Sequence, residues 1–249
     1  MSHAAAAERS TATGALPWLV WHRLVLVGLV QAALALAFLG AGVAAPWQAA
    51  ALAWPLAVTV TSLCTLLVLR SRLHAEGRRL RDLYRVDPST LTSDLRATAV
   101  LVVVAGVLAT APNLGLAWLV WGDLEAGVAL LVRPMPDLVA WVALLVFPLA
   151  VGLSELPWYF GYALPRLRAA FGARHAVLVT AAALSLQHVT IPLLFDLRFL
   201  LWRGLMFAPF AVFLAFVLHR RPRLLPYLVA MHVLLDLTVG VQIWLVSRG

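Results

Sequence analysis

Long apolar stretches alternate with shorter polar ones along almost the whole chain. Each apolar stretch holds about 20 or more residues, the length that an α-helix needs to cross a ~30 Å hydrocarbon core. The pattern predicts an all-α, polytopic transmembrane helical bundle of about seven spans. A further short or re-entrant helix within 121–135 would raise the count to eight. The seven expected spans are 17–40, 46–69, 97–120, 137–163, 175–196, 199–218 and 225–246.

The polar connections between these stretches differ in charge, and the difference predicts how the chain threads the membrane. The longest connection, 70–96, is rich in arginine, and 166–174 and 219–223 form two further basic turns. The remaining connections are poor in arginine. Because basic loops stay on the cytoplasmic side, we expect the N-terminus inside and, after seven spans, the C-terminus outside. Within 70–96 we expect an amphipathic or interfacial helix, or else a solvated loop.

The composition supports a membrane protein. Of 249 residues, 63% are hydrophobic and 12% charged, whereas soluble domains are typically about half apolar and a quarter charged. The net charge of +8 lies beside the spans, which favours the lipid bilayer as partner and argues against nucleic acid. Enrichment in Ala, Leu, Val and Arg suggests a bacterial source, and hence the inner (plasma) membrane. We expect a flexible N-terminal tail at 1–15 and a single integral membrane domain at 16–249.

Four ionisable residues lie inside predicted spans of the last hundred residues: Glu155, His188, His232 and Asp236. A charged group at the bilayer centre costs at least about 2.5–3.5 kcal/mol, so such residues usually have a task. At 1.5 Å per residue, their expected depths from the cytoplasmic side are roughly 15, 20, 10 and 16 Å. The four side chains can therefore share one central intramembrane cavity. Interhelical hydrogen bonding that only holds the helices together is the competing interpretation.

Local spacing adds detail around these residues. His232 and Asp236 are four apart, so they lie on one helical face. Either Asp236 fixes the tautomer of His232, or both side chains face the reaction centre directly. Tyr159 follows Glu155 by four residues and shares its face in the same way. Pro192 follows His188 by four, and within a helix it would leave the carbonyl of residue 188 without its usual donor.

The segment Ser154–Leu167 reads S-E-L-P-W-Y-F-G-Y-A-L-P-R-L. It resembles the first motif, E-E-x-x-x-R-G, of the CAAX-protease and bacteriocin-processing (CPBP/Abi) family of intramembrane glutamic endopeptidases. Glu155 stands at the first Glu of that motif and Gly161 at its glycine. Leu156 and Phe160 stand where the family has its second Glu and its Arg. Their joint replacement removes one charge of each sign, so it is electrically neutral.

Two later segments follow in the order of the same family. Leu184 and His188 stand at the places of an aromatic residue and a histidine in its second motif. His232-x-x-x-Asp236 matches the third motif, His-x-x-x-Asn or Asp. The motifs lie within 137–246 and agree with the family in order, spacing and membrane context.

The resemblance implies an intramembrane endopeptidase with a conical cavity, in which a glutamate activates water without a metal or other cofactor. Glu155 would be the general base, and His188 would orient the water. His232, oriented by Asp236, would stabilise the developing oxyanion. Tyr159 is our own candidate for an auxiliary proton donor. The expected partner is a peptide or membrane-protein substrate.

Three other interpretations use the same residues. Glutamate, histidine and aspartate are zinc ligands, and a three-ligand zinc site with a bound water is hydrolytic. A non-catalytic membrane scaffold or self-immunity protein of the same family would explain Leu156 and Phe160 as marks of lost activity. A proton-coupled transporter would use the buried Glu and His residues as a relay.

Overall fold

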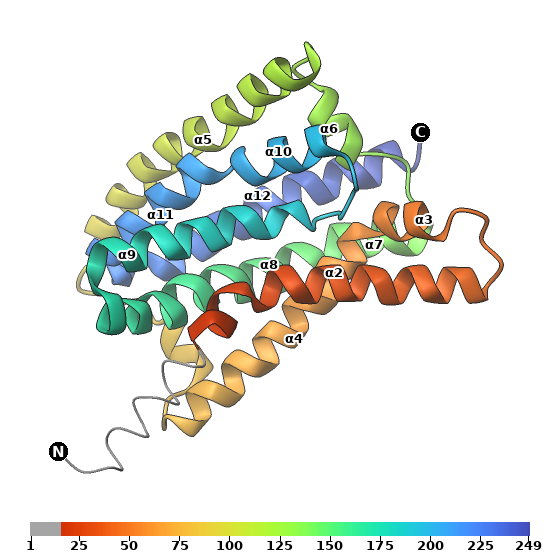
Figure 1. Ribbon diagram of the computed structural model, residues 1–249. Coiled ribbons are helices and arrows are strands. Elements are labelled where there is room, and N and C mark those ends of the chain that lie inside the picture. Colours follow the sequence, from red (N-terminus) through yellow and green to blue (C-terminus); the bar gives the residue numbers. More distant parts are fainter. Residues whose placement is uncertain (1–15) are drawn as a thin grey trace.

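The computed structural model describes residues 16–249, so the tail expected at 1–15 lies outside the described residues. The described chain is all-helical, as predicted, and contains no strand (Figure 1). Elements η1, η3 and η4 are short 3-10 helices and η2 is a π-helix. In chain order the elements are α2 (Leu16–Gly40), α3 (Pro46–Leu52), α4 (Trp54–Ala75), η1 (Leu80–Tyr84), α5 (Leu91–Trp121), α6 (Ala126–Leu131), α7 (Asp137–Leu145), α8 (Phe147–Leu156), η2 (Pro157–Ala163), α9 (Leu164–Leu186), η3 (Gln187–Val189), α10 (Leu197–Leu205), α11 (Ala208–Arg220), η4 (Pro222–Leu224) and α12 (Leu225–Val246).

Six helical stretches of the described chain are long and apolar enough to cross a membrane. The longest, Phe147–Val189, has 43 residues and is interrupted at Gly172. Gly172 has a φ of 79°, a left-handed conformation that glycine adopts readily and that ends a right-handed helix. Figure 1 shows that the chain turns back between α8 and the labelled part of α9. The other five stretches are Trp18–Gly40, Trp54–Ala75, Leu91–Trp121, Leu197–Arg220 and Pro222–Val246.

Each of two predicted spans consists of two helices, and the second helix of each has a proline in its first turn. The span expected at 46–69 consists of α3 and α4, separated at Ala53, and Pro55 lies in the first turn of α4. The span expected at 137–163 is divided at Val146, and Pro148 lies in the first turn of α8. Proline lacks a backbone N–H and fits the first turn of a helix, where that donor has no helical partner anyway.

The polar connections differ in part from the prediction. A single amphipathic helix over 70–96 is wrong: α4 continues to Ala75, the five-residue η1 follows, and α5 already begins at Leu91. Gly77 has a φ of 71° just after α4, which a helix cannot continue through. The short helix considered within 121–135 is present as α6.

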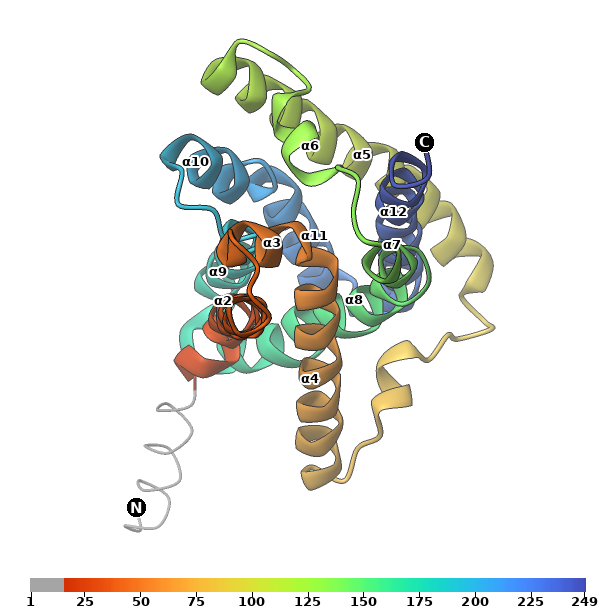
Figure 2. The same ribbon diagram turned by 90° about the vertical axis from the view of Figure 1, so that its right-hand side faces the viewer.

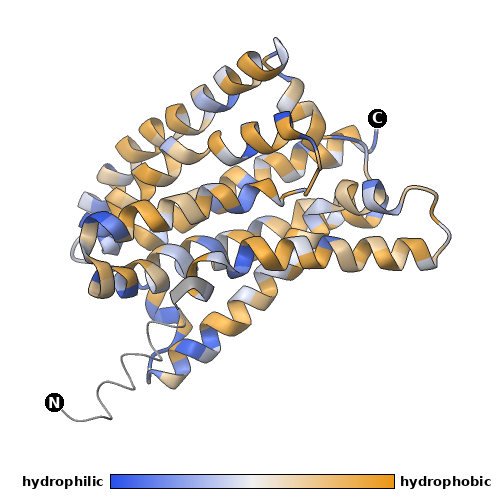
Figure 3. Cartoon of the chain, in the orientation of Figure 1, coloured by the Kyte–Doolittle hydropathy of each residue, from blue (hydrophilic) through white to orange (hydrophobic). Residues whose placement is uncertain are grey.

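The basic connections lie together at one end of the bundle. Arg166 forms an ion pair with Glu76, which brings the turn after η2 to the end of α4. Arg223 forms an ion pair with Asp94 at 2.9 Å, which brings the turn after α11 to the start of α5. Figure 3 shows hydrophilic positions concentrated at these helix ends, while the helices between them are mostly hydrophobic. The C-terminus lies at the opposite end (Figure 1).

Helix α12 packs closely against α7 and α8 because glycines remove side chains at the two contacts. A Cβ atom on Gly152 would lie 2.3 Å from Cγ2 of Val233, and one on Gly240 would lie 2.2 Å from the carbonyl oxygen of Ala143. Small residues at such contacts let helix backbones approach closely within a membrane. The Gly152 contact lies one turn from Glu155 and next to His232 in the sequence, so it brings the helices that carry them together.

The linker before α5 also supports helix α8. Pro157 has no N–H to donate to the carbonyl of Leu153, four residues earlier. The phenol of Tyr84 donates to that carbonyl instead, at 2.5 Å. Burial raises the pKa of Tyr84 to about 12, so the phenol stays a donor at neutral pH. A residue of the linker therefore replaces a backbone hydrogen bond two residues before Glu155.

Candidate active site

Glu155 lies near the end of α8 with only 2% of its surface exposed. Its two carboxylate oxygens have different partners. Oε2 accepts hydrogen bonds from Nε2 of Gln187 at 2.6 Å and from Nη2 of Arg23 at 3.4 Å. Oε1 lies 3.3 Å from Nε2 of His232. One oxygen is thus held by fixed donors, and the other faces the histidine of α12.

Arg23 of α2 is the cation that accompanies this carboxylate, and its side chain is fully buried. Its Nε donates to Oε1 of Gln187 at 3.0 Å, and its Nη1 to Oγ of Ser154 at 3.2 Å. Nη2 also donates to Oγ of Ser62 at 3.3 Å. A buried ion pair is tolerable when further hydrogen bonds satisfy its remaining donors. The guanidinium group therefore joins α2, α4, α8 and η3 around Glu155.

His232 lies between two carboxylates. Its Nε2 is 3.3 Å from Oε1 of Glu155 and 3.4 Å from Oδ2 of Asp236, one helical turn away on α12. A neutral imidazole has one N–H, so Nε2 can donate to at most one of the two carboxylates at a time. Asp236 thus faces the same nitrogen as Glu155, and neither its Oδ2 nor Nδ1 of His232 has a hydrogen-bond partner among the described residues.

His188 lines the same cavity but makes no hydrogen bond or ion pair with Glu155. It follows the end of α9, within the 3-10 turn η3. Its Nδ1 lies 2.8 Å from the carbonyl oxygen of Leu184, so this nitrogen carries the hydrogen and Nε2 is an acceptor. The expectation that Pro192 leaves the carbonyl of His188 unpaired is wrong: the helix has already ended, and that carbonyl accepts from the N–H of Ile191 at 3.0 Å.

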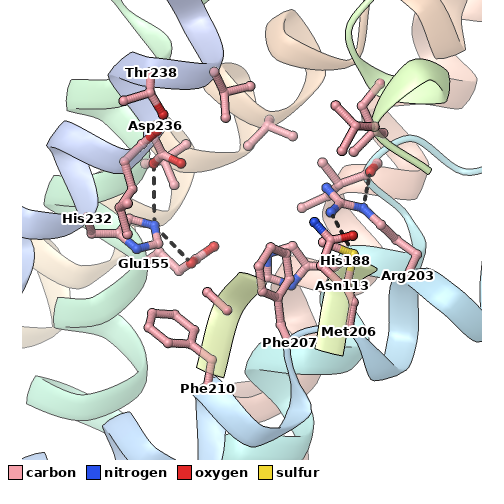
Figure 4. A pocket seen from close by; sticks show the side chains of 18 of the residues that line it. Asn113, Glu155, His188, Arg203, Met206, Phe207, Phe210, His232, Asp236 and Thr238 are labelled. Carbon is pink, nitrogen blue, oxygen red and sulfur yellow. Dashed lines mark hydrogen bonds and ion pairs between the residues drawn. The ribbon is translucent and has the colours of Figure 1, made fainter. Parts of the chain in front are cut away.

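A cavity of about 400 Å³ opens beside these residues. Figure 4 shows Glu155, His232 and Asp236 on one side of it, and Arg203 on the facing side. Most of the other lining side chains are apolar, which is typical of pockets that bind small molecules or side chains. The apolar lining includes Val58, Phe147, Val151, Leu184, Phe207 and Phe210.

Three further residues of the first motif point into the protein. Tyr159 is fully buried, and its hydroxyl donates to Oε1 of Gln187 at 3.2 Å. It therefore supports the Gln187–Arg23 network and is not among the residues that line the cavity. Leu156 and Phe160 both belong to the main apolar core and are 0% and 4% exposed.

The structure adds polar residues that the motif comparison did not include. Arg23 and Gln187 hold Glu155, and Arg203 lines the cavity with 5% of its surface exposed. The sequence could have indicated both arginines, because a charged residue within an apolar stretch usually has a structural or functional role. Gln187 gave a weaker signal, as a neutral amide next to His188. Neighbouring His22 lies between the rings of Trp18 and Trp158 and does not line the cavity.

Glu155, His232 and Asp236 are the side chains of the site that could bind a metal ion. Within residues 16–249, no group of three or more His, Cys, Asp or Glu side chains is arranged to hold a metal ion. Glu155 and Asp236 each have an oxygen within 3.4 Å of Nε2 of His232, so the imidazole lies between the two carboxylates.

Comparisons of the chain with models of protein families, with curated proteins and with solved structures found no match. The fold and site define a helical membrane protein in which a buried glutamate, a histidine and an aspartate meet at a cavity.

Proposed function

We propose that this protein is a metal-independent intramembrane endopeptidase of the CAAX-protease and bacteriocin-processing type. The observation that carries the proposal is the carboxylate of Glu155. Its Oε2 is held by Arg23 and Gln187, while its Oε1 is directed at His232 beside the cavity. A general base needs a fixed orientation and an oxygen that can take a proton. Oε2 of Glu155 is fixed, and Oε1 can take the proton once Nε2 of His232 donates to the substrate oxygen.

In the proposed reaction, Oε1 of Glu155 takes a proton from a water while the water oxygen bonds to the carbonyl carbon of a peptide. The carbonyl electron pair moves onto its oxygen, where a hydrogen bond donated by Nε2 of His232 stabilises it. The C–N bond then breaks, and the proton on Glu155 passes to the leaving amine. His188 holds the water through its acceptor Nε2, and Asp236 positions His232.

The departures at Leu156 and Phe160 are compatible with this proposal because a cation reaches Glu155 from another helix. The family has an arginine five residues after its first glutamate, whereas this chain has Phe160 there. Arg23 of α2 contacts Glu155 in this structure. We infer that Arg23 supplies the positive charge that the first motif lacks.

We further propose seven spans, obtained by counting the interrupted stretch Phe147–Val189 as two. The arginine-rich end of the bundle would face the cytoplasm of a bacterium, with the protein in the inner membrane. The N-terminus would then be cytoplasmic. The cavity would lie within the bilayer, so that a peptide or membrane-protein segment reaches Glu155 from there.

Metal independence can be tested directly on purified protein. With 1,10-phenanthroline or EDTA, we expect peptide cleavage to continue at an unchanged rate. A zinc hydrolase built on Glu155, His232 and Asp236 would lose its activity and regain it when zinc is added. Metal analysis of the same sample should find less than one equivalent of zinc.

The activity itself is tested by comparing peptide termini in cells that lack the gene. Wild type and Glu155→Gln are expressed at matched levels, and termini are determined in membrane and secreted fractions. Asp137→Asn is the control, since it makes the same chemical change at an exposed position at the start of α7. We expect a set of termini with wild type and Asp137→Asn that is absent with Glu155→Gln.

Identical termini from all three proteins, each folded and abundant, would contradict the proposal. They would favour the non-catalytic scaffold or self-immunity protein, in which the Arg23–Glu155–His232 network only joins helices. A proton-coupled transporter would instead show substrate accumulation that depends on a pH gradient and is lost in Glu155→Gln.

A further inference from the structure

Arg203 is a buried cation without a carboxylate partner. It lies on α10, is 5% exposed, and lines the cavity. Its Nε donates to the carbonyl of Ile191 at 2.9 Å, and its Nη1 contacts the sulfur of Met206 at 3.6 Å. Within residues 16–249, no Asp or Glu oxygen lies within 4.0 Å of its guanidinium nitrogens.

The donors of Arg203 exceed the acceptors around it. A guanidinium has five N–H groups, and thioether sulfur is a weak acceptor. Figure 4 shows the group directed into the cavity, on the side that faces Glu155, His232 and Asp236. An unpaired charge in a membrane interior is costly, and such residues usually pair with another group or mark a ligand pathway. The free donors of Arg203 therefore point to an anion in the cavity.

A second donor lines the same cavity. Asn113 of α5 also lines the cavity. Its Oδ1 accepts a hydrogen bond from Nε1 of Trp202 at 3.0 Å, which fixes the orientation of the amide. The amide nitrogen makes no hydrogen bond with any described residue and can donate to a ligand. Figure 4 shows Asn113 on the same side of the cavity as Arg203.

The rest of the cavity is suited to the apolar part of a ligand. Its walls are mostly aliphatic and aromatic, and they include Ala109 of α5 and Val239 of α12. Helix α5 buries only Asp94, Ala105 and Ala117 among its residues, so it offers an apolar face to lipid. A volume of about 400 Å³ lies within the ~300–1,000 Å³ range of small-ligand pockets.

We propose that Arg203 and Asn113 form a binding site for an oxyanion on an alkyl chain, a fatty carboxylate or an alkyl phosphate. Guanidinium groups bind both anions with paired N–H donors. The alkyl chain would lie along the apolar walls and be drawn from the bilayer. This function is independent of peptide hydrolysis at Glu155.

Binding is measured by titration calorimetry on the purified full chain in a non-ionic detergent. The probes are dodecanoate, dodecyl phosphate and, as the neutral control, dodecanol. We expect at least one anion to bind tenfold or more tightly than dodecanol. Which of the two binds more tightly identifies the ligand as a fatty carboxylate or an alkyl phosphate. Glu155→Gln abolishes cleavage, and because it removes a carboxylate from the same cavity it should bind the anions at least as tightly as wild type, so the two proposals can fail separately.

Variants of Arg203 and Asn113 test whether these residues cause the preference for an anion over dodecanol. Arg203→Met should remove it, Arg203→Lys should retain part of it, and Arg198→Met, an exposed neighbour on α10, should leave it unchanged. Asn113→Leu changes no charge and should weaken anion binding several-fold, so it tests the site even if Arg203→Met does not fold. Equal binding of anions and dodecanol, or an unchanged preference in Arg203→Met and Asn113→Leu, would overturn the proposal. Arg203 would then be only a distant counter-charge to Glu155 and Asp236.

Discussion

The carboxylate of Glu155 is stable inside an apolar bundle because its charge is matched and its oxygen Oε2 is fully bonded. Arg23 supplies the charge, and Gln187 supplies the shortest hydrogen bond, at 2.6 Å. Replacing both members of a buried ion pair by apolar groups is often neutral, whereas removing one member leaves an uncompensated charge. The importance of Arg23 therefore depends on whether Glu155 remains.

Arg23→Met should destabilise the protein by about 3–5 kcal/mol, because Glu155 would keep a buried charge without its partner. Thermal or denaturant unfolding in detergent measures the change. Arg248→Met is the control, since Arg248 is partly exposed and its ion pair with Asp137 is long, at 3.9 Å. We expect this control to lie within about 0.5 kcal/mol of wild type.

The double variant Arg23→Met/Glu155→Gln extends the same test. The stability losses caused by substitutions within one buried network do not add. The double variant should therefore lose less unfolding free energy than the two single variants lose together. Additive costs, or an Arg23→Met variant as stable as Arg248→Met, would contradict the role given to Arg23.

At the scale of the elements, α8 depends on two contacts from other parts of the chain. Tyr84 replaces the donor that Pro157 lacks, and Gly152 lets α12 approach. Both contacts lie within three residues of Glu155 in the sequence. Changes at either position should therefore affect the site without altering any residue that lines the cavity.

Tyr84→Phe should destabilise the protein by about 1–3 kcal/mol, because the carbonyl of Leu153 would lose its donor at membrane depth. The matched control is Tyr227→Phe, since the buried Tyr227 hydroxyl has no partner among the described residues. Removing it should cost nothing measurable. Unfolding measurements that give equal losses for the two variants would show that the Leu153 bond has no special role.

The same phenol predicts a pH dependence. The pKa of Tyr84 is raised to about 12 by burial, above the ordinary value near 10. Its contribution to stability is therefore complete below about pH 10 and is lost as the pH rises through about 12. The difference in stability between wild type and Tyr84→Phe should shrink over that interval.

Gly152→Ala should cost about 1–3 kcal/mol, because its Cβ would lie 2.3 Å from Cγ2 of Val233 and force α8 and α12 apart. The shift would also lengthen the contact between Glu155 and His232, so peptide cleavage should fall more than Tyr84→Phe lowers it. Gly106→Ala is the control: nothing lies within 4 Å of its Cβ, and alanine favours the helix. Adding Val233→Ala to Gly152→Ala should restore stability, and its failure to do so would disprove the close-packing explanation.

At the scale of the whole molecule, the hydrophobic pattern predicted the helical membrane fold, because the length and apolarity of a span are local properties of the sequence. Each of the seven expected ranges contains helix. The pattern did not predict where α9 ends, because the turn at Gln187–Val189 lies within an apolar run. The hydrophobic pattern also did not identify Gly172 as the residue at which the helix is interrupted and the chain turns between two spans.

The candidate site was predicted less completely. Glu155, His188, His232 and Asp236 were found from their polarity in apolar stretches, and the structure places them around one cavity. The bonds from Arg23 join residues 131 and 164 positions away in the sequence. Such partners depend on which face of α2 packs against α8 and η3, and spacing along the chain carries no information on that packing.

The direction of the whole bundle in the membrane follows from where its arginines gather, and it can be tested with single cysteines. Cys64→Ala removes the one native cysteine. Ser89→Cys and Asp123→Cys then place a thiol at exposed positions on the connections before and after α5. With a membrane-impermeant maleimide on spheroplasts, we expect labelling at 123, while 89 is labelled only after lysis, because basic connections stay inside.

Arg248→Cys in the same background tests the number of spans. Seven crossings put the C-terminus opposite the basic linker, so residue 248 should be labelled together with 123 in intact spheroplasts. Six crossings, with Phe147–Val189 counted once, would protect residue 248 together with 89. Labelling of 89 and protection of 123 would reverse the orientation and place the arginine-rich end of the bundle outside the cell. In that case the depths expected for Glu155, His232 and Asp236 would be counted from the outer surface, and peptides exposed on that side would be the substrates to test against Glu155.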